Sequence, residues 1–194
     1  MTDTPTILVF AGSTRSGSLS AQLANAMALA LRDAGATPTL ITLADYKAEI
    51  YNGDDEEAHG APQTMRDLNA LFHAHDGVAI ATPEYNAYFP PLLKNALDWC
   101  SRPSSTDKRP PLPRGKPAAV IASAPGPKGG IRVLPKLRDQ MIELGFAVTP
   151  EPLAVGNAGD AFEEDGRLKE EFGAGQLKTV AESLVTMCRA KAAL

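Results

Sequence analysis

Five runs of apolar residues that favour β-strands are spaced along the chain. The first, third and fourth runs are apolar throughout and do not alternate with polar positions, which is typical of strands covered on both faces of a parallel sheet. The fifth run is interrupted by prolines. We predict strands over Thr6–Ala11, Thr37–Leu43, Gly77–Thr82, Pro117–Ser123 and Phe146–Val155.

Between and after these runs, apolar residues recur every three to four positions, the spacing of one face of an α-helix. Residues typical of helix ends support this interpretation. Pro62 lies near the start of one such segment, and Gly35 follows the end of another. The alternation of strand and helix predicts a doubly wound α/β sheet with helices on both faces. The predicted helices are Leu19–Ala34, Pro62–Ala74, Pro91–Ser101, Ile131–Leu144 and Gly175–Ala193.

Two segments depart from this alternation, and we expect both to be surface loops. Asp45–Ala61 carries four consecutive carboxylates, and a charge run of this kind ordinarily marks a solvated face. Arg102–Lys116 is basic and proline-rich, which suits a rigid connector or an extended surface for a partner. Neither segment is a linker long enough to separate domains, so we expect residues 1–194 to form a single domain.

Composition narrows the class of protein. With 194 residues, 44% of them hydrophobic, the chain can bury a sizeable core, and a net charge of −4 argues against a nucleic-acid partner. No stretch reaches the roughly 18 apolar residues of a membrane span, and the first residues lack the pattern of a signal peptide. Cys100 and Cys188 fit neither a disulfide framework nor a metal site, so we expect buried thiols in a cytoplasmic protein.

The loop after the first strand, Gly12–Ser20, has the composition of a phosphate site. Its glycines allow close approach, amides at the start of the next helix carry partial positive charge, and Arg15 can bind two phosphate oxygens. The loop lacks the Gly-Lys ending of a P-loop, and Thr14 replaces the second glycine of the dinucleotide fingerprint. We expect a phosphorylated small molecule here; a serine-rich helix cap without a ligand is the alternative.

The loop after the third strand places a carboxylate, an amide and three aromatic rings within Pro83–Phe89. Such a surface suits a planar heteroaromatic ring, although it could instead cover the sheet edge or an oligomer contact. Pro90 should hold Phe89 out of the following helix, and we expect Ala87, Tyr88 and Phe89 to face the ligand or a neighbouring subunit. Because a phosphate site is predicted one strand away, FMN fits both loops.

Four segments resemble the NAD(P)H-dependent FMN reductase family, which includes chromate and quinone reductases and azoreductase-like flavoproteins. They are Gly12–Ser20, Pro83–Asn86, Leu93–Trp99 and Pro125–Gly130, and the resemblance spans most of the chain. It implies a flavodoxin-like three-layer sandwich with a five-stranded parallel sheet in the order 2-1-3-4-5. It also implies non-covalently bound FMN, NADPH or NADH as co-substrate, and a homodimer or homotetramer.

The resemblance also implies roles for individual residues. The serines and the arginine of the first loop would hold the phosphate, the second loop would border the isoalloxazine, and Ser123–Gly130 would close over its pyrimidine side. This chain departs from many members at Ser20, at Ala87-Tyr88 in place of Gly-Ser, and at Ala124. The expected cofactor-binding residues are Ser13, Arg15, Ser18, Leu19, Ser20, Pro83, Glu84, Tyr85, Asn86, Ser123, Pro125 and Gly126.

The expected function is an FMN-dependent oxidoreductase that uses NAD(P)H to reduce quinones, flavins, azo compounds or metal oxyanions such as chromate. No side chain need act as nucleophile or general acid, so we predict no catalytic residue in that sense, and no metal site. We expect the helix start near Gly129–Ile131, with Lys128, to favour anionic reduced flavin. A flavodoxin-type electron carrier is the alternative, and a sensor or scaffold without flavin is a third; Arg15 and the modest net charge favour the reductase.

Overall fold

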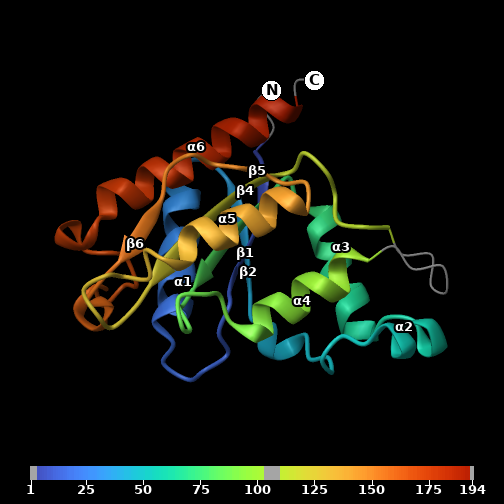
Figure 1. Cartoon of the computed structure of the whole chain (residues 1–194). Helices are drawn as coiled ribbons and strands as arrows, with labels where there is room; N and C mark the ends of the chain where they lie inside the picture. The colour runs from blue at the N-terminus through green and yellow to red at the C-terminus, as the bar shows by residue number, and fades with distance from the viewer. Residues whose placement is uncertain (1–3, 103–109, 193–194) are drawn as a thin grey trace.

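A parallel β-sheet runs through the middle of the molecule and is covered by helices on both faces (Figure 1). The computed structural model describes residues 4–102 and 110–192. Strands β1 (Thr6–Ala11), β3 (Gly77–Thr82) and β4 (Pro117–Ser123) have their predicted bounds, and β2 (Thr37–Ile41) is two residues shorter. The order β2-β1-β3-β4-β5 confirms the predicted flavodoxin-like topology.

The single fifth strand predicted over Phe146–Val155 is wrong. Two short strands, β5 (Ala147–Val148) and β6 (Leu153–Val155), take its place, and both pair in parallel with β4. Pro150 and Pro152 lie between them, and proline has no N–H to donate to a neighbouring strand. The sheet therefore has six strands in five lateral positions.

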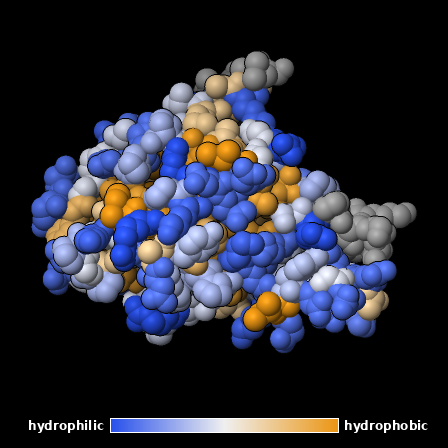
Figure 2. Space-filling view, viewed as in Figure 1, coloured by the Kyte–Doolittle hydropathy of each residue, from blue (hydrophilic) through white to orange (hydrophobic). Residues whose placement is uncertain are grey.

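Two groups of helices bury separate apolar cores against the two faces of the sheet. Helices α1 (Leu19–Asp33) and α6 (Ala174–Ala192) pack together on one face. The other face carries α3 (Gln63–Ala74), α4 (Pro91–Ser101) and α5 (Val133–Glu143). On the side shown in Figure 2 hydrophilic side chains predominate, and hydrophobic ones reach the surface only in separate small patches.

The predicted acidic loop, Asp45–Ala61, is partly helical. A 3₁₀ turn over Leu43–Asp45 follows β2, and α2 (Gly53–His59) begins where the side chain of Asn52 accepts a hydrogen bond from the amide of Asp54 at 3.0 Å. A polar cap, which the sequence reading overlooked, thus starts this helix.

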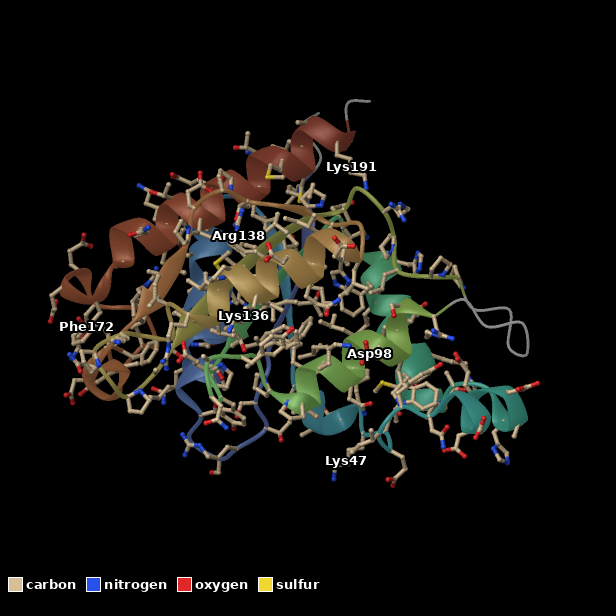
Figure 3. The ribbon with its side chains drawn as sticks, in the orientation of Figure 1. Lys47, Asp98, Lys136, Arg138, Phe172 and Lys191 are labelled. Carbon is tan, nitrogen blue, oxygen red and sulfur yellow. The ribbon has the colours of Figure 1, made fainter. Side chains whose placement is uncertain are left out.

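Two side chains of the motif Leu93–Trp99 hold the segment 45–61 against the rest of the protein by hydrogen bonds. On α4, the Asn95 side chain accepts from the amide of Tyr51 at 2.8 Å, and Trp99 Nε1 donates to the carbonyl of Glu49 at 2.9 Å. Lys94 and Asp98 form a surface ion pair at 2.5 Å on another side of the helix (Figure 3). These contacts give the motif a structural role, and its Leu93 also lies close to Gly12 in the first loop of the predicted site.

The proline-rich segment Arg102–Lys116 is also not simply a surface loop. Residues 103–109 lie outside the described part, but Leu112 and Lys116 are buried. Lys116 Nζ donates to the carbonyls of Phe72, at 2.6 Å, and of His75, which satisfies the end of α3. Burial lowers the pKa of Lys116 below its ordinary value.

Short 3₁₀ turns over Ala158–Asp160 and Glu170–Phe172 connect β6 to α6. Cys100 and Cys188 are buried thiols that form no disulfide in the described residues. In the described residues, no helix is both long and apolar enough to cross a membrane.

Candidate functional site

The loops after β1, β3 and β4 meet at one edge of the sheet. The strands are in register there, because Ala11 pairs with Ala81 and Thr82 pairs with Ala122. A cavity of about 280 Å³ opens between the loops. Ten of the twelve predicted cofactor-binding residues line it: Ser13, Arg15, Ser18, Leu19, Ser20, Pro83, Glu84, Tyr85, Ser123 and Pro125. Asn86 and Gly126 do not line this cavity.

The first loop presents unsatisfied hydrogen-bond donors to the cavity edge. Ser18 caps α1, because its Oγ accepts from the amide of Ala21 at 3.3 Å and lies 2.9 Å from the Oγ of Ser20. The amides of Gly17, Leu19 and Ser20 donate to no group in the described residues. Free amides at a helix start bind anions, so the loop has the donors that a phosphate needs.

Arg15 is exposed and lies against its own loop. Its guanidinium donates to the carbonyl of Ser16 at 3.1 Å and to that of Gly17 at 3.2 Å. The side chain also borders two hollows beside the cavity. Its predicted contact with phosphate stays a prediction.

The second loop is a tight hairpin. Tyr85 and Tyr88 exchange backbone hydrogen bonds of 2.8 and 3.0 Å around Asn86 and Ala87, which have φ angles of 50° and 64°. Two consecutive positive φ angles define a type I′ turn, in which asparagine is favoured at the first position and glycine at the second. The turn geometry therefore explains why glycine suits position 87, where this chain has alanine.

The aromatic rings of this loop face different surroundings. Tyr85 and Tyr88 are 48% and 46% exposed, whereas Phe89 is buried in the core. Phe89 lies outside α4, as predicted, but the expectation that it faces a ligand or a subunit is wrong. Because Pro90 extends the backbone, Phe89 turns inward beneath Tyr88, with ring centroids 4.5 Å apart. Lys136 extends from α5 to within 5.5 Å of the Tyr88 ring (Figure 3).

Glu84 is held by a residue that the sequence reading did not single out. Its carboxylate accepts from Arg132 Nε at 2.8 Å, from Arg132 Nη2, and from the Arg132 backbone amide at 3.1 Å. Burial would raise the pKa of Glu84, but the hydrogen bonds and charge of Arg132 outweigh it and hold that pKa below its usual value. Glu84 is therefore an ionised, fully partnered carboxylate at neutral pH.

The segment before α5 is a series of turns, so the helix begins two residues later than predicted. Gly129 and Gly130 have φ angles of 61° and 85°, which are left-handed values that a helix does not contain. The amide of Arg132, at this helix start, is directed at Glu84. The expectation that the free end of this helix acts on a flavin therefore needs revision.

Ser123, at the end of β4, carries an unsatisfied group. It is buried, and its Oγ has no hydrogen-bond partner in the described residues, although it lines the cavity. Buried hydroxyls are nearly always paired, so this one indicates a ligand. Free amides at a helix start, a cavity bordered by Tyr85 and a buried hydroxyl fit FMN. Among the described residues no group of three or more His, Cys, Asp or Glu is arranged to hold a metal.

Comparisons with known proteins agree with this geometry. A family model described as NADPH-dependent FMN reductase matches residues 5–160. The chain is 34% identical over 175 residues to an NAD(P)H-dependent FMN reductase of Pseudomonas aeruginosa, covering 88% of each chain. It is 30% identical over 172 residues to a quinone reductase of Pseudomonas putida, again covering 88% of each. The solved structure of FerB, a flavoenzyme NAD(P)H:(acceptor) oxidoreductase from Paracoccus denitrificans, superposes with a TM-score of 0.78 at 27% identity, covering 96% of this chain and 98% of FerB.

Proposed function

This chain belongs to the NADPH-dependent FMN reductase family, and we propose that the cavity at its sheet edge binds FMN and delivers electrons to a quinone. The protein is an NAD(P)H-dependent oxidoreductase with FMN as its cofactor, which confirms the class and the cofactor expected from the sequence. We propose the residue roles and the acceptor from the cavity geometry and from the functions of the relatives.

The buried Ser123 hydroxyl is the observation that carries the assignment of the cavity. Leu19 and Ser20, whose amides have no partner in the described residues, line the same cavity, so groups without protein partners come from two loops. A ligand with a phosphate at one end and a polar ring edge at the other would satisfy the groups of both loops.

We assign phosphate binding to one side of the cavity and contact with the flavin ring to the other. When bound, FMN would supply two-electron transfer between a nicotinamide and an acceptor. The start of α1 binds the phosphate through its amides and through Ser18 and Ser20, with Arg15 supplying charge. Ser123 donates to the polar edge of the ring, while Pro83 and Tyr85 border its plane. Asn86 and Gly126, which lie outside the cavity lining, have supporting roles in their loops.

We assign no general acid or base among the described residues that line this cavity. Glu84 is the only carboxylate among them, and both its oxygens accept hydrogen bonds from Arg132. Its lowered pKa keeps it deprotonated, and its hydrogen bonds hold it against the wall. The side chains therefore bind and orient two flat molecules.

A flat acceptor suits the open side of the site. The exposed rings of Tyr85 and Tyr88 offer aromatic surface beside the cavity, on which a quinone could stack. We also propose that the chain acts as one domain in a cytoplasmic homodimer or homotetramer. Exposed Tyr88 and Ile131 next to the site support a subunit contact there.

Steady-state kinetics test the acceptor. FMN-loaded protein should be assayed with NADPH and with NADH against a quinone, free flavin, an azo dye and chromate. We expect the quinone to give the highest kcat/KM with the better nicotinamide. Faster reduction of any other acceptor would contradict the quinone assignment, and no turnover with any pair would indicate an electron carrier.

A further inference from the structure

Glu84 lines the cavity, and its negative charge is balanced by its ion-pair partner Arg132. Glu84 comes from the loop after β3 and Arg132 from the segment after β4, 48 residues later in the chain. The carboxylate side chain is 9% exposed, whereas the guanidinium side chain is 58% exposed. Glu84 lines the cavity and Arg132 stands behind it.

The backbone is shaped to bring these two segments together. Gly130 has a φ angle of 85°, and a Cβ at this position would lie 3.1 Å from the Cβ of Ala122 and 3.5 Å from the Cβ of Glu84. The turn therefore passes closely against Glu84, where a larger residue would push it away. The amide of Arg132 then donates a hydrogen bond to this carboxylate.

Three sources of positive charge thus meet one negative charge beside the cavity. They are the Arg132 side chain, its backbone amide, and the other free amides at the start of α5, which together with that amide carry a partial positive charge. Without Glu84 this group would attract an anion in the cavity. Reduced flavin is such an anion once its N1 proton is lost, whereas oxidised flavin has a neutral ring.

We infer that Glu84 sets the reduction potential of the bound flavin by cancelling the positive charge of Arg132 at the start of α5. The two residues are positioning residues, because they act on the ring through charge and not by proton transfer. This inference rests on the proposed function, since it requires FMN in this cavity. It replaces the simpler expectation that the helix start acts on the flavin unopposed.

The test measures the reduction potential of FMN bound to the holoenzyme at pH 8, by anaerobic titration against a reference dye. Glu84→Gln leaves Arg132 uncompensated, so it should favour reduced over oxidised FMN by roughly tenfold. Arg132→Gln leaves a lone carboxylate at the wall and should shift the ratio by a similar factor in the other direction. Tenfold corresponds to about 30 mV for a two-electron couple, upward in the first variant and downward in the second.

Three further variants separate charge from structure. Glu84→Gln/Arg132→Gln removes both charges and should return the potential close to the wild-type value. Arg132→Lys keeps the charge and loses the two-pronged geometry, so its potential should also stay near wild type. Glu143→Gln removes a carboxylate at the other end of α5, about 16 Å from Arg132, and should leave the potential unchanged.

A merely structural pair predicts a different pattern. Both single variants and the double variant would then weaken oxidised and reduced FMN equally, and the potential would not move. That result, or shifts of the same sign in both single variants, would overturn the inference while leaving the proposed function intact. Wild-type protein that binds no FMN after reconstitution would overturn the proposed function and the inference with it.

Discussion

In the loop after β4, we expect replacement of Gly129 to destabilise the folded protein more than replacement of the other glycine tested there, Gly126. A Cβ added there would lie 2.6 Å from the backbone nitrogen of Gly156 and 2.7 Å from the carbonyl carbons of Ala154 and Val155. These are backbone atoms of β6 and the residue after it, so no side-chain rotation can relieve the overlap. The φ angle of 61° adds a second cost for any residue with a side chain.

Two other glycines provide matched controls for these two costs. Gly17 has a φ angle of 66° but no atom within 4 Å of an added Cβ, so Gly17→Ala should cost about 1 kcal/mol from backbone strain alone. Gly126 has neither feature, and Gly126→Ala should stay within about 0.5 kcal/mol of wild type. Gly129→Ala combines strain with overpacking and should cost about 3 kcal/mol or more.

Urea unfolding of the FMN-free protein measures all three variants without interference from ligand binding. The free energy of unfolding should fall in the order Gly126→Ala, Gly17→Ala, Gly129→Ala. If Gly129→Ala loses no more than Gly17→Ala, the close passage of this loop against β6 is not what makes glycine necessary there.

Four other substitutions test the site and the core. Arg15→Ala should weaken FMN binding by roughly 10- to 150-fold and riboflavin binding much less; equal losses would show that Arg15 does not bind phosphate. Tyr88→Gly should change the ratio of quinone to chromate reduction while FMN affinity moves by less than about tenfold. A shift in oligomeric state on gel filtration at constant ratios would instead make Tyr88 a subunit contact. Ser123→Ala should weaken FMN binding about tenfold, yet leave the FMN-free protein as stable or up to about 1 kcal/mol more stable, because an unpaired hydroxyl is removed; unchanged affinity would argue against its contact with the ring. Burial raises the pKa of the Cys188 thiol from 9.0 to about 12, so above pH 9 the folded chain keeps a proton that the unfolded chain loses. Wild-type stability should therefore fall by up to about 1.4 kcal/mol per pH unit relative to Cys188→Ala, and parallel pH profiles of the two proteins would contradict this.

The sequence predicts the fold well where the local pattern of residues is compatible with only one type of secondary structure. β1, β3 and β4 are continuous apolar runs with polar or turn-forming neighbours, and α4 begins at Pro91 after a second proline. The site follows from topology, because the carboxyl ends of parallel strands meet at one edge. The residues that follow these strands in the sequence therefore include most of those that line the cavity.

The errors arise where distant contacts or single backbone angles decide the structure. Nothing near Arg132 in sequence shows that it meets Glu84, and nothing near Lys116 shows that its amine reaches the carbonyls at the end of α3. The helix predicted from Ile131 starts two residues later because the turns at Gly129 and Gly130 continue through Ile131 and Arg132. Phe89 was misread because aromatic composition alone does not distinguish a ring that faces a ligand from one that completes the core.

The most direct test of the account is the reductive half-reaction. FMN-reconstituted protein is placed under argon, NADPH or NADH is added in equal amount to the flavin, and the absorbance of the bound flavin is followed. We predict that the yellow colour bleaches with at least one nicotinamide and returns when a quinone is added. Bound FMN that stays oxidised with both nicotinamides, yet is reduced by dithionite, would contradict the assignment and indicate a flavodoxin-type carrier.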